Sequence, residues 1–230
     1  MAPTHPAGGG VTFRPREPAD LPTLVTLLAA QQARSHYPFR WPLPFPPEQF
    51  IARETERHSW VAVVDGTTAG HIAVTEVIDD DFSRVWTAAT GRAASGLGCV
   101  SAFFVDETRR GSGIGGGLLD RAVALLRLQG RLPVLDVVQR HGDALAIYRH
   151  RGWREVGEVR PPWLPADEPP VIAMVLDDPT GDPITLPPAT GLRAVDLHPP
   201  EQPSAATDHR PRDGVDVERT GRQQLRAPRA

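Results

Sequence analysis

Lysine and asparagine are absent from the 230 residues, and cysteine occurs once, at Cys99. Without lysine, the chain lacks the residue with which a Walker-type phosphate loop reaches its phosphates. A single cysteine excludes an internal disulfide and a zinc cluster built on cysteines, and the histidines show no metal-ligand spacing. No apolar run approaches the roughly 20 residues of a membrane span, and residues 1–10 lack the basic and apolar regions of a signal peptide. We therefore expect a cytoplasmic protein with no metal and no membrane partner.

The overall charge gives no field that would attract nucleic acid. The formal net charge is −3, and hydrophobic and charged residues make up 40% and 23% of the chain. These values are typical of a globular domain with a sizeable core. The 25 prolines crowd the regions before residue 50 and after residue 160. This distribution predicts irregular loops and a loose end rather than a repeat or a second domain.

The first half of the chain predicts a strand, two helices and a hairpin. Apolar residues spaced at helical intervals follow Asp20, which we expect to cap the helix. The proline-rich run at 37–47 is predicted to be a loop, because each proline fixes φ and lacks an N–H. The remaining predicted elements are a strand from Val11, a helix at 48–58, and strands at 60–64 and 71–77 around an Asp-Gly turn.

The second half predicts strands and helices in alternation. An acidic run at 79–81 opens what we expect to be a loop as far as Gly98; it could attract a cationic substrate or simply be solvated. Then come a strand at 99–105, a glycine-rich turn, an amphipathic helix that stops at Gly130, a strand at 132–138, a short helix at 143–151, and strands at 153–159 and 171–176. We predict one folded domain over 11–177, with disorder at 1–10 and in the proline-rich tail at 178–230.

The glycine-rich turn carries the strongest functional signal. In F-F-V-D-E-T-R-R-G-S-G-I-G-G-G-L-L-D a strand ends, arginines follow, and glycines lead directly into the helix. Glycines allow a ligand close to the backbone, and the unpaired N–H groups of a helix start favour an anion. Each glycine weakens the helix start by roughly 1 kcal/mol relative to alanine. The pattern indicates a pyrophosphate site, although a tight turn alone would use similar residues.

A dinucleotide-binding unit is one alternative. Gly111, Gly113 and Gly116 satisfy G-x-G-x-x-G, and Asp136 follows about twenty residues later, as such units expect. However, five residues separate the strand from the first glycine, and too few βα units follow for a doubly wound sheet. This alternative would make the protein an oxidoreductase that uses a dinucleotide.

Two motifs resemble those of the GNAT superfamily of N-acetyltransferases. R-R-G-S-G-I-G-G-G-L-L is similar to its acetyl-CoA motif, R/Q-x-x-G-x-G/A, with Arg110, Gly113 and Gly115 in the defined positions. A-L-A-I-Y-R-H-R-G-W at 144–153 resembles its A-x-x-x-Y-x-x-x-G-F/W motif. The resemblance implies an α+β fold, an α/β/α sandwich whose mixed, mostly antiparallel sheet of six to seven strands carries helices on both faces. It also implies acetyl-CoA as co-substrate and a small-molecule amine or a peptide as acceptor.

The resemblance also implies the roles of individual residues. Tyr148 would be the general acid that protonates the departing CoA thiolate. His141 occupies a position where many family members have an asparagine that contacts the cofactor; it could instead act as a base. The residues expected to bind the cofactor are Phe103, Phe104, Val105, Arg110, Gly111, Ser112, Gly113, Ile114, Gly115, Gly116, His141 and Tyr148.

The general base has two candidates. Asp136 lies twelve positions before Tyr148, where members that acetylate protein N-termini carry a strand acid. It is a carboxylate in an apolar strand, so burial would raise its pKa; a hydrogen-bonded acid at the strand edge is the other interpretation. Glu76, on the strand before the acidic run, is the second candidate and would act through water.

The sequence leaves a second class of function open. A module that binds CoA without turnover would keep the fold and the glycine-rich turn. The identity of the acceptor and the oligomeric state, a homodimer included, are also left open.

Overall fold

A computed structural model describes residues 10–140 and 142–178, and for Gly142 and Asp143 the backbone only. The predicted disorder at 1–10 and 178–230 therefore falls almost wholly outside the described residues. The strands are β1 Thr12–Pro15, β2 Glu56–Val64, β3 Thr67–Thr75, β4 Leu97–Val105, β5 Leu132–Val137, β6 Arg154–Val159 and β7 Val171–Val175. The helices are α1 Leu21–Ser35, α2 Pro47–Ile51, α3 Asp81–Thr90, α4 Ile114–Leu128 and α5 Gly142–His150, with 3₁₀ turns η1 Pro18–Asp20, η2 Ala94–Gly96 and η3 Glu107–Arg109.

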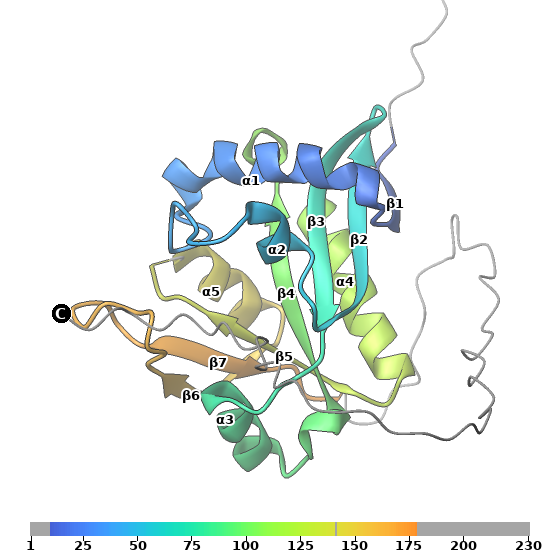
Figure 1. Ribbon diagram of the computed structural model, residues 1–230. Coiled ribbons are helices and arrows are strands. Elements are labelled where there is room, and N and C mark those ends of the chain that lie inside the picture. The colour runs from blue at the N-terminus through green and yellow to red at the C-terminus, as the bar shows by residue number, and fades with distance from the viewer. Residues whose placement is uncertain (1–9, 141, 179–230) are drawn as a thin grey trace, which may run out of the picture. The chain divides into compact units, whose positions relative to one another are not determined.

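The strands form one mixed sheet in the order β1-β2-β3-β4-β5-β7-β6. Only β4 and β5 are parallel; every other neighbouring pair is antiparallel. Helices α1, α2 and α3 lie on one face of this sheet, and α4 and α5 lie on the other (Figure 1). The predicted sandwich with a mostly antiparallel sheet is therefore confirmed. A doubly wound dinucleotide fold is excluded, because it requires a largely parallel sheet.

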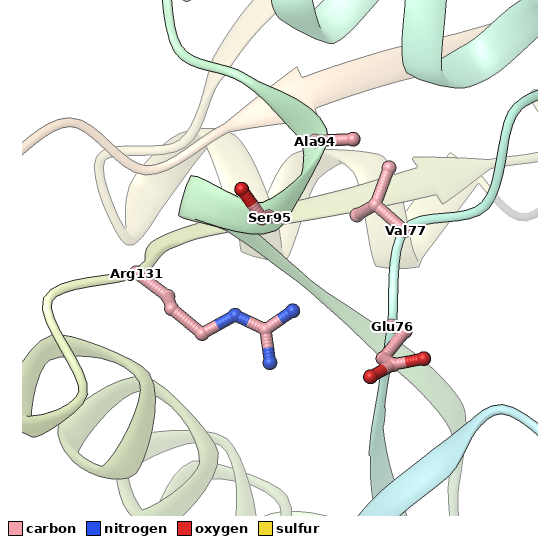
Figure 2. A pocket seen from close by; sticks show the side chains of 5 residues that line it. All are labelled: Glu76, Val77, Ala94, Ser95 and Arg131. Atoms are coloured by element: carbon pink, nitrogen blue, oxygen red, sulfur yellow. The ribbon is translucent and has the colours of Figure 1, made fainter.

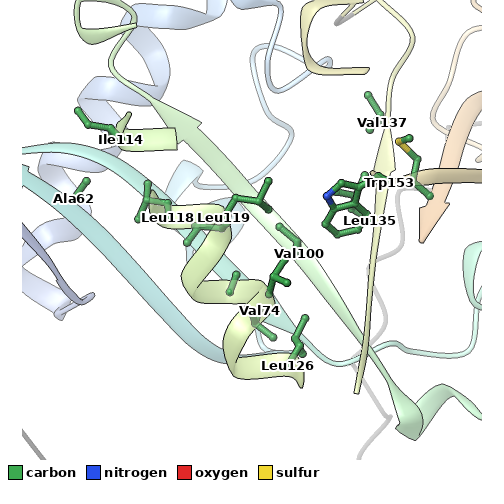
Figure 3. Packing of buried hydrophobic residues seen from close by; sticks show 14 of the residues in the cluster. Ala62, Val74, Val100, Ile114, Leu118, Leu119, Leu126, Leu135, Val137 and Trp153 are labelled. Carbon is green, nitrogen blue, oxygen red and sulfur yellow. The ribbon is translucent and has the colours of Figure 1, made fainter. Parts of the chain in front are cut away.

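The sheet opens in its middle. Parallel pairing joins only residues 97–99 of β4 to residues 132–134 of β5. Beyond Cys99 and Val134 no pairing connects the two strands, and their ribbons diverge (Figure 3). The edge of β4 that faces β5 is therefore without a strand partner from Val100 to Val105 among the described residues.

The largest core cluster lies between the sheet and the two helices α4 and α5 that cover one of its faces. As predicted, the helix that follows the glycine-rich turn buries one apolar stripe, with Ile114, Leu118 and Leu126 at most 1% exposed. Leu135 and Val137 of β5 and Trp153 after α5 complete the cluster (Figure 3). This packing fixes the start of α4 against the end of β4.

Helix α3 replaces the loop that the sequence predicted at this position. Asp80 accepts a hydrogen bond from the Ser83 N–H at 2.8 Å, and the Asp80 N–H donates to the Ser83 hydroxyl at 3.0 Å, which is a capping box. Phe82, Val85 and Trp86 then pack on the sheet. The prediction was wrong because the small residues that follow hid this cap and apolar spacing.

Two further local predictions were right only in part. The helix predicted at 48–58 ends at Ile51, because residues from Glu56 onward pair with β3. Asp20 is the N-cap residue of α1, as predicted, but its side chain makes no capping hydrogen bond; its carboxylate instead accepts two hydrogen bonds from the Arg14 guanidinium, at 2.6 and 2.7 Å. That ion pair lowers the pKa of Asp20. In both places tertiary contacts outweigh a local preference.

Candidate active site

The glycine-rich turn starts where β4 ends. The Asp106 carboxylate accepts hydrogen bonds from the Thr108 N–H at 2.9 Å and from its hydroxyl at 2.8 Å, which forms η3. The chain then passes through two glycines with positive φ, Gly111 at 79° and Gly113 at 81°. These angles favour glycine, so the turn depends on both residues. Gly113 is the N-cap of α4.

The turn leaves a group of backbone amides without acceptors. The N–H groups of Gly111, Gly113, Ile114, Gly115 and Gly116 donate to no acceptor within the described residues, whereas Gly117 N–H bonds to the Gly113 carbonyl at 2.9 Å. We call these five donors the amide cradle. Together with the positive end of the α4 dipole they form a site suited to a pyrophosphate.

The glycines of α4 differ in their surroundings. A Cβ at Gly115 would lie at ordinary contact distance from Phe103, 3.5 Å away. A Cβ at Gly117 would come within 2.4 Å of the Phe13 ring, which also carries the Arg121 guanidinium at 3.8 Å from its centroid. Gly117 is therefore required for packing against β1, and the glycines before it serve the turn and the cradle.

Strand β4 contains a bulge near its C-terminal end. His71 pairs with Phe104 and Ala73 with Ser101, so Ile72 alone faces Ala102 and Phe103. The side chains of Phe103 and Val105 then pack in the core on the α4 side of the sheet, and the side chain of Phe104 packs on the α1 side. The three residues predicted to pair with the pantetheine arm lie on the part of β4 whose edge toward β5 has no strand partner.

Asp136 stands on β5 just beyond the last pair with β4. Its neighbours in the strand, Leu135 and Val137, are buried toward α4, as the predicted alternation requires. The Asp136 side chain is open to solvent, although protein surrounds it on most sides. That enclosure raises the pKa of Asp136; the Arg53 guanidinium opposes the rise and Asp80 adds to it. A carboxyl group of this kind can exchange protons closer to neutral pH than an ordinary aspartate.

Tyr148 faces the same space from α5. Its ring packs edge-on against Trp153, with 5.7 Å between the centroids. Enclosure by protein raises the pKa of the Tyr148 phenol, and Tyr37, Asp136 and Cys99 raise it further. The phenol therefore stays protonated at neutral pH and can serve as a proton donor. The structure brings together the two groups that the sequence proposed as acid and base.

The comparisons with known proteins agree with this geometry. The sequence model described as the Acetyltransferase (GNAT) family matches residues 27–153, which include both motifs. The chain belongs to the GNAT acetyltransferase family. No curated protein matches it.

Solved structures support the GNAT fold. An acetyltransferase from Staphylococcus aureus Mu50 has 15% identity and a TM-score of 0.53, and the match covers 73% of this chain and 100% of the other. The ribosomal-protein-S18-alanine N-acetyltransferase from Escherichia coli has 18% identity and a TM-score of 0.52, with 76% and 99% covered. Naa50 from Arabidopsis thaliana, in complex with a bisubstrate analogue, has 16% identity and a TM-score of 0.52, with 73% and 99% covered.

Glu76, the second candidate base of this GNAT protein, lies in a different environment. Its carboxylate pairs with the Arg57 guanidinium at 2.7 Å, and both side chains are about half exposed. It lines an open pocket of about 450 Å³ (Figure 2), together with Val77, Ala94, Ser95 and Arg131. The electrostatic interactions that link Asp136 to Tyr148 do not include Glu76.

Of three further predicted cofactor contacts, the structure describes two. The Arg110 guanidinium forms an ion pair with Glu107 at 3.0 Å and remains 59% exposed, next to the cradle. Ser112 donates its hydroxyl to the Arg109 carbonyl at 2.5 Å, so its side chain supports the turn. His141 lies outside the described residues.

Three groups near the site were not predicted from the sequence: Tyr37, Arg53 and Cys99. Enclosure raises the pKa of Tyr37, while Arg53 and a hydrogen bond with the Phe103 backbone lower it. Enclosure also raises the pKa of the Cys99 thiol to about 12, so this cysteine is not a thiolate nucleophile. Tyr37 and Arg53 precede β4 by more than forty residues in the sequence, and no local pattern indicates that they lie near the site.

In the described part of the chain, no helix combines the length and the apolar character needed to cross a bilayer. Within residues 10–140 and 142–178, no group of three or more His, Cys, Asp or Glu side chains is arranged to hold a metal ion.

Proposed function

We propose that this GNAT protein transfers the acetyl group of acetyl-CoA to a primary amine of a small molecule or a protein N-terminus by direct attack. The observation that carries the proposal is the amide cradle at the start of α4, next to the unpaired edge of β4. Asp136 and Tyr148 lie together beyond the point where β4 and β5 separate. We also propose that the enzymatic domain spans residues 11–177 and works in the cytoplasm, where one thiol stays reduced.

The cradle and the edge of β4 would hold acetyl-CoA. The five free N–H groups suit the diphosphate, and Arg110 at the mouth adds positive charge. The peptide groups of Phe103, Phe104 and Val105 would take the pantetheine arm as a strand takes a neighbour. Holding thioester and amine in line accounts for most of the acceleration, roughly 7–11 kcal/mol.

Asp136 and Tyr148 would move the protons. Asp136 takes a proton from the ammonium form of the acceptor, and the neutral amine forms a bond to the thioester carbon. The C–S bond then breaks, and Tyr148 gives its phenol proton to the thiolate. The surplus proton on the new amide nitrogen restores the phenol. A backbone amide of β4 stabilises the oxyanion between these steps.

The acceptor class rests on the site and on the names of similar structures. A carboxylate within reach of Tyr148 suits an acceptor that arrives as a cation. The Escherichia coli protein is named a ribosomal-protein-S18-alanine N-acetyltransferase, and Naa50 was solved with the bisubstrate analogue CoA-Ac-MVNAL. Peptide N-termini and small amines are therefore the acceptors to test first.

The test is a turnover screen of the full chain with acetyl-CoA and a panel of amines, read by release of CoA thiol. Calorimetry with acetyl-CoA runs in parallel. The proposal expects binding and turnover, with Tyr148→Phe lowering kcat by about 10²-fold at nearly unchanged acetyl-CoA affinity. Binding without turnover of any amine would instead identify a CoA-binding module, and no binding would overturn both.

A further inference from the structure

The bulge in β4 holds an alanine in an unusual conformation. Ala102 has a φ of 45°, whereas the other non-glycine residues with positive φ among those described, His36 and Asp65, lie at a helix end and in a hairpin turn. An L-residue in this region costs roughly 1–2 kcal/mol. Such a conformation persists in a strand only if neighbouring contacts hold it.

His71 supplies that contact. Its Nδ1 lies 2.7 Å from the Ala102 carbonyl oxygen. Because a carbonyl only accepts, Nδ1 must carry the proton and donate it. The imidazole is 0% exposed, and the Phe104 ring packs against it with 5.5 Å between centroids. A buried donor at this distance ties the middle of β3 to the strained residue of β4.

The other ring nitrogen shows that the histidine is not explained by packing alone. Nε2 is buried and has no partner among the described residues. An unsatisfied buried acceptor costs roughly 1–3 kcal/mol, which an aliphatic side chain of similar size would avoid. The bond from Nδ1 to Ala102 is therefore the feature that distinguishes histidine at this position.

The bulge changes the direction of the backbone that follows it. Val100 and Phe103 both pack toward α4, although an unbroken strand would place residues three apart on opposite faces. Ala102 and Phe103 have no residues of their own opposite them on β3. The Phe103 backbone instead meets the Tyr37 phenol, which interacts electrostatically with Asp136 and Tyr148. The bulge thus directs a peptide group at the candidate acid and base.

We propose that His71 is a positioning residue for acetyl transfer: by donating to the Ala102 carbonyl it holds the β4 bulge and fixes the direction of the β4 peptide groups that follow, one of which stabilises the oxyanion. This role rests on the proposed function. His71 itself touches neither substrate. It acts through the backbone of β4, and it supplies the rigidity that a preorganised oxyanion donor needs.

The experiment compares two polar replacements. Asparagine places its amide nitrogen near the position of Nδ1, and glutamine places it near that of Nε2. We expect His71→Asn to keep kcat within about threefold of wild type and His71→Gln to lower kcat at least tenfold. The dissociation constant for acetyl-CoA should change less than threefold in both. Equal losses of kcat in the two variants, or a loss confined to acetyl-CoA affinity, would overturn the role.

A second variant tests the link to Ala102. Glycine adopts positive φ freely, so Ala102→Gly should restore at least part of the kcat that His71→Gln loses, while alone it changes kcat little. Absence of rescue would contradict the proposal. Leu126→Val, which trims a buried side chain at the other end of α4, controls for general loss of stability and should keep kcat.

The same variants separate this proposal from the proposed function. If wild type turns over no amine, the proposed function fails, and the His71–Ala102 link is then read from the free energies of unfolding of the single and double variants. Coupling between the two substitutions would support the His71–Ala102 link even though the proposed enzymatic function had failed. Additive effects would overturn the link.

Discussion

Cys99 of β4 and Val134 of β5 form the last pair between the two parallel strands, and the candidate groups on both strands lie beyond it. Phe103 and Asp136 can face a common space only because pairing stops there. A fully paired β4–β5 ladder would occupy the peptide groups that we assign to acetyl-CoA. The position of this last pair therefore decides where chemistry can take place.

The pH dependence of the rate should report Asp136. As a base it acts only when ionised, and enclosure raises its pKa, so kcat/KM should fall in acid from a pH above the usual range of aspartate. Asp136→Asn should lower kcat/KM by about 10²-fold and remove that acid limb. The measurement is a pH–rate profile of both proteins. An acid limb that survives unchanged in Asp136→Asn would assign it to another group.

Arg53 provides a finer test of the same pKa. Its positive charge lowers the pKa of Asp136, so Arg53→Gln should move the acid limb to higher pH. Arg57→Gln is the matched control, because Arg57 is also exposed and pairs instead with Glu76. A shift of equal size in both variants would point to the net charge of the protein.

The cradle should depend on the backbone angle of Gly113. Alanine at a φ of 81° costs roughly 1–2 kcal/mol, and a turn that relaxes to relieve it turns its amides away from the ligand. We expect Gly113→Ala to weaken acetyl-CoA binding about tenfold or more, measured by calorimetry.

Gly66→Ala is the control for this variant. Gly66 has a φ of 77° in the β2–β3 hairpin, and an added Cβ would meet nothing within 4 Å there, as at Gly113. The backbone strain is therefore matched. Gly66→Ala should lower the free energy of unfolding by a similar amount and leave acetyl-CoA affinity intact. Equal losses of affinity would mean that stability, and not the cradle, governs binding.

The sequence predicted the glycine-rich turn and the placement of Asp136 because both follow from local pattern. For glycines at a strand-to-helix junction and for a carboxylate in an alternating strand, the neighbouring few residues are enough to predict the geometry. Tyr37, Arg53 and His71 could not be found this way. His71 has its role only because the register of β3 and β4 sets it beside the Ala102 carbonyl, and register is a tertiary property. Helix α3 lies between these cases, since Asp80 and Ser83 carry a local capping signal but the small residues that follow them favour a loop.

The α3 cap is testable through stability. Asp80→Ala removes the acceptor of the Ser83 N–H and should lower the free energy of unfolding by about 1 kcal/mol. Asp79→Ala, one residue earlier, removes an exposed charge that lies 3.9 Å from Arg84 and should change stability much less. Urea unfolding of the two variants decides the matter. Equal effects would show that charge, and not the cap, stabilises the start of α3.

His71 should make the folded protein sensitive to acid. The pKa of His71 is lowered from its ordinary value of 6.5 to about 4, mainly by burial; the Arg16 charge also lowers it, whereas the hydrogen bond to the Ala102 carbonyl and the charges of Glu56 and Asp20 oppose the shift. Between these values the unfolded chain binds a proton that the folded chain does not, so the free energy of unfolding falls as the pH drops from 6.5 toward 4. The full loss is about 3 kcal/mol, and it levels off at lower pH.

Acid effects from other groups, such as the Asp20–Arg14 pair, are common to wild type and His71→Asn and cancel in their difference. Urea unfolding at pH 7, 6, 5 and 4 should therefore show the wild type losing its advantage over His71→Asn within this window; a difference that is constant with pH would mean that His71 is not buried in its neutral form.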